Sequence, residues 1–568
     1  MPTPRTVTHR SLPGGSPFHL RWRALLLSLL VAAGALLMSA APAVARQPNV
    51  IFLLTDDQGW GDAAAWGHPY YKTPNLDRLT REGTRISQFY VANPVCSPSR
   101  TAFMTGRYPA RFRIHGHFAT HEQNEARAMP DWLDPQTPTI TRQLQAAGYV
   151  TGHFGKWHLG GGEGAPEPGA YGINKHVTIV SNGPQLKEKG SPPEPHWWGE
   201  STGIIMDHAI AFLREHKDKP FYLNIWTLVP HATLDPTPEQ LAVYDALEPR
   251  ADHPAFGKWT QGYYKAAKDL RSQMRVFAAS ITDLDTQVGR LLDTLKELGL
   301  DNDTLLVFSS DNGPEDYHIG NAANAGVGSP GPHRGRKRSI YEGGVRQPFV
   351  VRWPGRVKAG VFDETSVIGS VDFLPTVCAI TGVKPPAGVK LDGEDVSDIL
   401  LGGISRPRKS PLFWEWRSSV AGNPDFAPPP IVVRDGKWKL LTNRDRNRVE
   451  LYDIPADPAE TNNLAAANPS VVERLAKLAL DWKATLPPGE EKPLPRGKGK
   501  GKAQPKSAAL DRPAIFKAKD TNKDGNLSLA EYLHNFPDPD EGRRRFPTFD
   551  TNKDGLLSEE EFVKMGKP

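Results

Sequence analysis

The residues that are most clearly suited to catalysis lie in one short segment around a cysteine. Cys96 begins the run CSPSRTAFMTGRYPAR, in which Pro98 and Arg100 follow at short offsets and the triplet TGR comes next. A cysteine can serve as a thiolate nucleophile or can be a buried structural thiol, and the residue type alone does not separate these roles. The flanking residues make this segment a motif and favour a functional role.

Two acidic clusters follow apolar runs that are typical of buried strands. Asp56 and Asp57 come directly after NVIFLL, and Asp311 and Asn312 come directly after TLLVFSS. An isolated acidic pair is usually a solvated turn, but two such clusters beside the cysteine motif favour a metal site. Carboxylate and amide oxygens suit a hard cation, so the sequence predicts Ca²⁺ or Mg²⁺ and argues against zinc.

Basic and histidine residues follow the other apolar runs. Lys156 and His158 lie two apart in GKWHLG, so on an extended segment their side chains point to the same side. His231 follows LNIWTLVP and is a candidate general acid, because imidazole titrates near neutrality. The alternatives are a surface lysine and packed, structural histidines.

The elements that must position these residues alternate between strands and helices. The runs NVIFLL, YVTGHF, FYLNIWTLV, TLLVFSS and PFVVRW predict buried strands, and helices are expected over 137–148 and 274–299. This alternation predicts an α/β fold around a large, mostly parallel sheet. Active sites gather at the carboxyl ends of such strands, where these polar residues stand.

A smaller unit is expected after a boundary near residue 380. Short strands over 411–417, 431–441 and 449–454 and a helix over 471–486 predict an antiparallel sheet with one covering helix. Residues 487–510 are rich in Pro, Gly and Lys and predict a linker. The predicted domains are 1–45, a signal peptide; 46–380, catalytic; 381–486, the smaller subdomain; 487–510, the linker; and 511–568, a separate tail.

The N-terminus has the features of an export signal. Arginines precede the apolar run 24–38, which ends in the small-residue site Ala43-Val44-Ala45. The run is short for a membrane span of about 20 residues, so cleavage after Ala45 is favoured over an anchor. We therefore expect a periplasmic or secreted protein with no stable membrane anchor.

Composition narrows the function classes. The 568 residues are 38% apolar and 23% charged, an ordinary globular mixture that excludes a disordered or fibrous chain. The net charge of +5 gives no support for nucleic-acid binding. Two cysteines are too few for a disulfide framework.

The tail contains two 12-residue loops, 520–531 and 550–561, each with the D-x-N-x-D-G start and the position-12 Glu of a calcium-binding EF-hand. Leu527 and Leu557 at position 8 are expected to pair the loops. The predicted Ca²⁺ ligands are Asp520, Asn522, Asp524, Asn526 and Glu531 in the first loop, and Asp550, Asn552, Asp554, Leu556 and Glu561 in the second.

The motifs together resemble one enzyme family. C-x-P-x-R followed by TGR is similar to the signature of formylglycine-dependent (type I) sulfatases, in the alkaline phosphatase superfamily. TDDQGWGD, AAGYVTGHFGKWHLG, SDNGP, RGRKRSIYEGGVRQP and ELYDIPADPAETNNL resemble further sulfatase blocks in the same order, over residues 47–480. The resemblance implies an alkaline-phosphatase-like sandwich fold and an α-helical EF-hand tail appended to it.

The resemblance also implies a mechanism. A dedicated maturation enzyme would oxidise Cys96 to formylglycine, whose hydrated aldehyde supplies one hydroxyl to attack sulfur and a second to expel sulfate. Ca²⁺ would be held by Asp56, Asp57, Asp311, Asn312 and the residue derived from Cys96.

The remaining roles also follow from the resemblance. Arg100 would fix the diol near the metal, Lys156 would bind a sulfate oxygen, and His158 would accept a proton from the diol. Lys337, in RGRKRSIYEGG, would neutralise sulfate or the departing oxygen. Three arginines surround Lys337, so the choice among these basic residues stays open: Arg334, Arg336 and Arg338.

The expected function is hydrolysis of a carbohydrate sulfate or an aryl sulfate. One alternative is a phosphodiesterase or phosphonate monoester hydrolase of the same superfamily. Another is an inactive, sulfatase-like calcium-binding or adhesion protein, which the intact set of candidate residues disfavours. Ser181, Asn182 and His176 are candidates for the substrate side of the site, and the sequence does not choose among them.

Overall fold

The computed structural model describes residues 47–179, 181, 197–316, 323–417, 423–487, 516–517, 519–533, 546–547 and 549–564, together with Thr6. These residues form two compact units, divided at residue 495. The signal peptide predicted over 1–45 and the linker predicted over 487–510 fall outside the described residues, apart from Thr6 and residue 487. In the described part of the chain, no helix is long and apolar enough to cross a bilayer.

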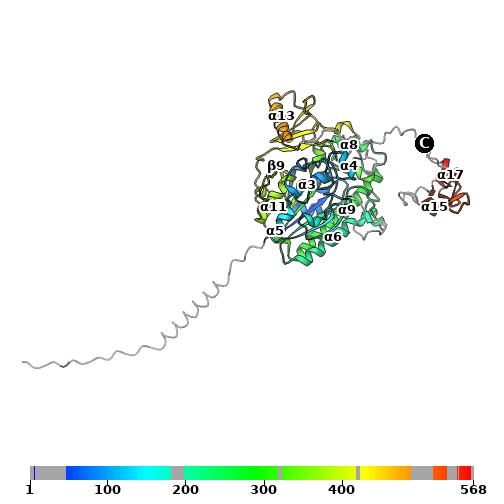
Figure 1. The fold of residues 1–568 in the computed structure, drawn as a ribbon, viewed down its shortest axis with the longest axis horizontal. Helices are drawn as coiled ribbons and strands as arrows, with labels where there is room; N and C mark the ends of the chain where they lie inside the picture. The colour runs from blue at the N-terminus through cyan, green and yellow to red at the C-terminus, as the bar shows by residue number, and fades with distance from the viewer. Residues whose placement is uncertain are drawn as a thin grey trace, which may run out of the picture. The chain divides into compact units, whose positions relative to one another are not determined.

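A nine-stranded sheet forms the centre of the first unit (Figure 1). Its strand order is β4-β3-β5-β1-β6-β8-β2-β7, and β9 pairs with β2. All strands run parallel except β7 and β8, which confirms a large, mostly parallel sheet. The strands are β1 (Asn49–Thr55), β2 (Thr84–Tyr90), β3 (Val150–Lys156), β4 (Lys175–Ile179), β5 (Phe221–Trp226), β6 (Thr304–Ser310), β7 (Arg346–Gln347), β8 (Phe349–Arg352) and β9 (Val361–Gly369).

Helices cover both faces of this sheet. Along β1, Phe52 packs into one apolar core while its neighbours Ile51 and Leu53 pack into the other, because successive strand side chains point to opposite faces. The first core also contains side chains from α3 (Cys96–Thr105), α5 (Ile140–Ala146) and α11 (Phe373–Thr381), and the second contains side chains from α2 (Pro74–Glu82), α6 (Trp197–His216) and α9 (Leu270–Glu297). Shorter helices are α4 (His121–Ala126), α7 (Pro238–Ala242), α8 (Lys258–Lys265), α10 (Glu342–Val345) and α12 (Ser397–Gly402). This layering confirms the predicted sandwich.

The small antiparallel sheet is also confirmed. It comprises β10 (Leu412–Glu415), β11 (Ile431–Asp435), β12 (Trp438–Thr442) and β13 (Val449–Asp453), in that order, and α13 (Pro469–Ala484) packs on it through Leu475 and Ala479. Buried Lys439 on β12 pairs at 2.9 Å with Glu342 on α10 and at 2.9 Å with Glu460. These contacts join the small sheet to the segment that leads into the large one, and both sheets belong to the same compact unit.

Several element boundaries differ from the sequence prediction. The strand expected over 431–441 is a hairpin of β11 and β12, because Gly436 takes a left-handed conformation at φ 56°. The strand expected over FYLNIWTLV ends at Trp226, since the chain turns before Pro230. The helix expected over 137–148 is shorter, Ile140–Ala146, since Thr139 caps its first turn. Strands β2 and β9 were not predicted; β9 alternates irregularly and is partly exposed, so its apolar pattern is weak.

The second unit contains the two predicted EF-hand loops. Short strands β14 (Asn526–Ser528) and β15 (Leu556–Ser558) pair antiparallel with Leu527 opposite Leu557, as predicted. Helices α15 (Leu529–Leu533) and α17 (Glu559–Lys564) follow. In both loops the position-12 carboxylate, of Glu531 or Glu561, accepts hydrogen bonds from backbone N–H groups at the loop start. The unit has its own small core, formed by Phe516, Leu527, Tyr532, Phe546 and Leu557.

The division into two units generates a prediction about the tail. A chain ending at residue 490 should keep its kcat on a small, soluble sulfate ester within about twofold, because the catalytic candidates all lie in the first unit. Steady-state kinetics of the truncated and full-length proteins, both shown to be folded by circular dichroism, would test this. A large loss of kcat in a folded, truncated enzyme would show that the tail contributes to the site.

Candidate active site

The sheet topology brings the predicted strand-end residues together. Strands β3, β5, β1 and β6 are consecutive neighbours and parallel, so their carboxyl ends meet at one edge. Thr55 is in register with Ser310, which places Asp56 and Asp57 beside Asp311 and Asn312. All four of these polar side chains are buried. Their convergence follows directly from where four apolar strands end.

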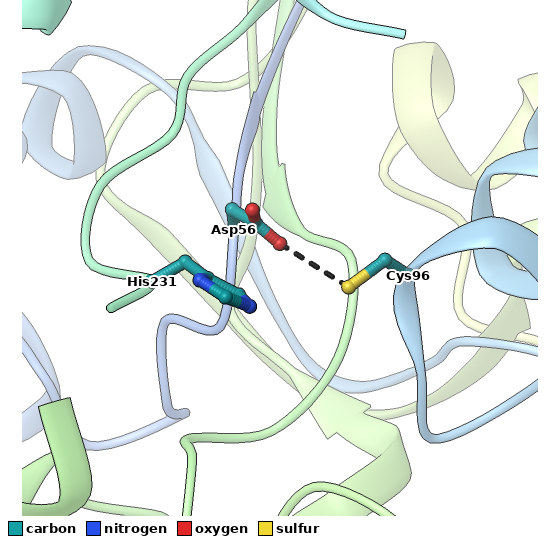
Figure 2. Close-up of side chains that lie close together, drawn as sticks. All are labelled: Asp56, Cys96 and His231. Carbon is teal, nitrogen blue, oxygen red and sulfur yellow. Dashed lines mark hydrogen bonds between the residues drawn. The ribbon is translucent and has the colours of Figure 1, made fainter. Parts of the chain in front are cut away.

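Helix α3 delivers the reactive segment to the same edge. Cys96 is its first residue, after Val95 in an extended conformation, and every residue of α3 is buried. The Cys96 sulfur lies 3.4 Å from Asp56 Oδ1, and Figure 2 shows the side chains of Cys96, Asp56 and His231 gathered at this point. Arg100 is four residues after Cys96 and therefore lies on the same face of the helix.

Each buried aspartate of the cluster is paired with a different cation. Lys156 Nζ lies 2.5 Å from Asp56 Oδ2, and Lys337 Nζ lies 2.6 Å from Asp57 Oδ2. The third pair joins Arg100 Nη2 to an Asp311 carboxylate oxygen at 2.7 Å. Buried ion pairs contribute little net stability because desolvation offsets their attraction. Six charges at the end of an apolar sheet are therefore better explained by chemistry than by folding.

These cations control the charge of the aspartates. Burial alone would raise the pKa of Asp56, but Lys156, His231 and Arg100 outweigh it and hold the pKa well below its usual range. Burial and the neighbouring Asp56 raise the pKa of Asp311 to about 7, despite Arg100. The Asp56 carboxylate is therefore strongly ionised, whereas the positive charges around Asp311 do not fully offset its burial.

The residues present fit a hard divalent cation. Ligand atoms of Asp56, Asp57, Asp311 and Cys96 all lie within 4.8 Å of one another. Asn312 Oδ1 is buried and has no hydrogen-bond partner within the described ranges, while its Nδ2 donates to Asp57 Oδ1 at 2.7 Å. An unpartnered amide oxygen beside three carboxylates suits Ca²⁺ or Mg²⁺, which take all-oxygen shells.

Lys337 is the basic residue of its segment that reaches the aspartate cluster. Arg334 donates to the backbone oxygen of Asp425, and Arg336 donates to the backbone oxygens of Glu315, Gly326 and Gly328. These two arginines hold the surrounding loops. Contact geometry therefore favours Lys337 over these two arginines, and its role in the reaction stays a prediction.

Glu315 was not predicted, and it organises two cations of the site. Its carboxylate lies 3.3 Å from Lys337 Nζ and also contacts the Arg338 guanidinium. Burial would lower the pKa of Lys337, but Asp57, Cys96 and Glu315 raise it above its usual value, so the lysine stays charged. The available signal was its position, three residues after Asn312 in the polar run SDNGPED that follows β6.

The two histidines occupy different positions. His231 Nε2 lies 3.7 Å from Asp57 Oδ2, and its pKa is lowered by burial and by Lys337. His158 Nε2 lies 3.3 Å from both the Phe118 backbone oxygen and Ser181 Oγ, whereas its Nδ1 is buried and has no hydrogen-bond partner among the described residues. Burial and Lys156 lower the pKa of His158 well below its usual value, so its imidazole is neutral.

The three candidates for the substrate side of the site lie in different places. Ser181 contacts His158, Asn182 lies outside the described residues, and His176 lies within β4, in register with His153.

Three residues of the site have a left-handed backbone conformation. Asp57, His158 and Arg338 adopt φ values of 66°, 52° and 70°, in the left-handed region that side-chain-bearing residues seldom occupy. Such strain persists where surrounding contacts over-determine a conformation, and it clusters at functional sites. The loops after β1 and β3 are thus held in conformations that present these side chains.

The Cys96 thiol does not ionise readily. Burial raises the pKa of Cys96, and the charges of Lys156 and Lys337 do not reverse the shift. A protonated thiol is a weak nucleophile. The geometry thus places Cys96 at the centre of the site but does not favour direct thiolate chemistry.

Comparison with known proteins identifies the family. The family model "Sulfatase" matches residues 48–383. This chain belongs to the sulfatase family. The model "N-sulphoglucosamine sulphohydrolase, C-terminal" matches residues 334–482, and an EF-hand model matches residues 544–565, which include the second of the two loops. The family predicted from the motifs is thereby confirmed.

The relatives include several sulfatases. Human arylsulfatase A is 32% identical over 478 residues, covering 78% of this chain and 89% of its own. N-acetylgalactosamine-6-sulfatase of Canis lupus familiaris is 30% identical over 527 residues, covering 83% and 91%. Among solved structures, Ps i-CgsB in complex with k-i-k-neocarrahexaose has a TM-score of 0.62 at 23% identity, covering 77% of this sulfatase and 93% of its own chain. Sulfate ester hydrolysis is thus the activity class of this chain.

The cation site generates a mutational prediction. In this sulfatase, Asp57→Ala or Asp311→Ala should lower kcat by about 100-fold or more, because each removes a carboxylate ligand of the cation and one ion-pair partner of Lys337 or Arg100. Asp293→Ala provides a matched control, since Asp293 is an exposed residue of α9 that pairs with Arg78 of α2. Near-normal kcat in both site variants would contradict this metal site, whereas loss in the control as well would indicate general damage.

Proposed function

We propose that this sulfatase is an exported, metal-dependent hydrolase whose Cys96 is converted to formylglycine by a maturation enzyme. The observation that carries the proposal is the position of Cys96, at the start of α3 and 3.4 Å from Asp56. Three carboxylate–cation pairs surround it at the strand ends. Because burial raises the pKa of the Cys96 thiol, direct thiolate attack is disfavoured, whereas the hydrate of an aldehyde formed there would supply hydroxyl groups beside the lysines and the arginine.

The chain's own residues divide the work of sulfate transfer. Formylglycine, once formed from Cys96, would supply a hydrated nucleophile, and a cation held by the aspartate cluster would polarise sulfate oxygens. Lys156 and Lys337 neutralise the sulfate, and Arg100 orients the reacting residue. His158 accepts a proton at its buried Nδ1, which has no hydrogen-bond partner in the part of the chain that the structure describes. His231 donates a proton to the departing oxygen.

The proposed cation is Ca²⁺, with Mg²⁺ as the alternative, held by Asp56, Asp57, Asp311, Asn312 and the residue derived from Cys96. Two further Ca²⁺ ions are proposed for the EF-hand loops, in the sets predicted from the sequence. The matching hydrogen-bond pattern of the loops supports equal roles for both, although the EF-hand model covers one.

A carbohydrate sulfate is the proposed natural substrate, with aryl sulfates accepted as small analogues. Relatives named N-acetylgalactosamine-6-sulfatase, at about 30% identity, support this choice. The fold alone does not separate sulfatases from phosphonate monoester hydrolases: the enzyme from Agrobacterium radiobacter has a TM-score of 0.57 at 21% identity.

A paired assay tests the proposal. Enzyme produced with a sulfatase-maturing system should release sulfate from a panel of sulfated sugars and aryl sulfates faster than it releases phosphate from matched phosphate and phosphonate esters. Mass spectrometry of the same sample should show the Cys96 peptide as formylglycine, and Cys96→Ala should be inactive. Dominant phosphate release would overturn the sulfatase assignment, and a fully active sample with unmodified cysteine would overturn the mechanism.

A further inference from the structure

Positive charge gathers around His117, a half-buried residue in the segment after α3. The pKa of His117 is lowered to about 3, first by burial and then by four basic side chains: Arg127, Arg338, Lys337 and Lys156. Lys156 and Lys337 serve the aspartate cluster, and Arg338 is paired with Glu315. Arg127 and Arg338 have no role in the proposed reaction, and of these two only Arg338 has a carboxylate partner among the described residues.

Arg127 is a half-buried guanidinium with few partners. It follows α4, and its Nη1 donates to the His117 backbone oxygen at 2.9 Å. In the described part of the chain no carboxylate pairs with it, and its pKa is lowered by burial and by the charge of Arg338. An arginine has five N–H donors in a planar fork, so most of its bonding capacity remains available.

This arginine is linked to the reaction centre through short contacts. The segment that Arg127 bonds carries the His117 ring, whose centroid lies 6.4 Å from that of His158. The backbone oxygen of the next residue, Phe118, lies 3.3 Å from His158 Nε2, and the Phe118 N–H donates to Ser97 Oγ of α3. Arg127 therefore lies on the side of the site that His158 borders.

We propose that Arg127 binds a second anionic group of the substrate, a sulfate or carboxylate on the same sugar or its neighbour, and so selects polyanionic carbohydrates. This inference rests on the sulfatase function proposed above. A guanidinium pairs with either oxyanion through two parallel hydrogen bonds. A bound anion would also offset the repulsion between Arg127 and Arg338 and would not compete for the lysines that hold the scissile sulfate.

Kinetics on three substrates test this role. The substrates are 4-nitrophenyl sulfate, which has no second anion, a disulfated monosaccharide, and a disaccharide with one sulfate and one uronate. Arg127→Gln should lower kcat/KM on at least one of the two anionic sugars by about 10- to 100-fold, the range of a lost charged hydrogen bond. The two sugars identify whether the second anion is a sulfate or a carboxylate.

The controls separate specificity from damage. On 4-nitrophenyl sulfate, Arg127→Gln should stay within about twofold of wild type, since the scissile sulfate contacts other residues. Arg127→Lys should recover part of the loss because it keeps the charge. Arg81→Gln, an exposed charge-matched change on α2, should leave all three substrates unaffected.

The outcomes distinguish this inference from the proposed function. Equal losses on all three substrates would assign Arg127 a structural role and overturn the subsite. An unchanged Arg127→Gln variant on both anionic sugars, with 4-nitrophenyl sulfate still hydrolysed, would also overturn it while leaving the sulfatase function intact. Wild-type enzyme that releases no sulfate from any of the three would instead contradict the proposed function itself.

Discussion

The structure depends on the pairing of three buried aspartates with three buried cations at the carboxyl edge of one sheet. Removing a carboxylate from water costs several kcal/mol unless an opposite charge and hydrogen bonds compensate it. Asp56, Asp57 and Asp311 meet this requirement only when Lys156, Lys337 and Arg100 arrive together. These partners come from β3, from the loop before α10 and from α3, so the site cannot form from any one element.

This requirement explains features that packing alone would not. The order β3-β5-β1-β6 places the strand ends side by side. The first turns of α3 must also lie against this edge, because Cys96 and Arg100 face it from the same side of the helix. The left-handed conformations of Asp57 and His158 aim side chains at positions that an unstrained backbone would miss. Apolar cores on both faces of the sheet provide the rigidity that sustains this strain.

The sequence indicated most of the residues that the structure brings together at this edge, because they stand at the ends of strongly apolar strands or inside a dense motif. It could not show that Lys156 meets Asp56 while Lys337 meets Asp57, since pairing depends on strand order and sequence does not encode that order locally. Glu315 escaped prediction because an acidic residue in a polar loop has no pattern of its own. Strand β9 was missed because its apolar residues alternate irregularly, which gives it only a weak strand pattern. The hairpin at Gly436 was missed because the apolar runs on its two sides are close enough to resemble one strand.

The central claim is that the aspartate cluster holds one divalent cation, and metal content tests it most directly. Inductively coupled plasma mass spectrometry of dialysed, full-length enzyme would be compared with the Asp311→Asn variant, in which size and hydrogen bonding are largely kept. The variant should contain one equivalent of Ca²⁺ or Mg²⁺ less than the wild type, with the EF-hand equivalents unchanged in both. Identical metal content in a folded variant and the wild type would contradict it.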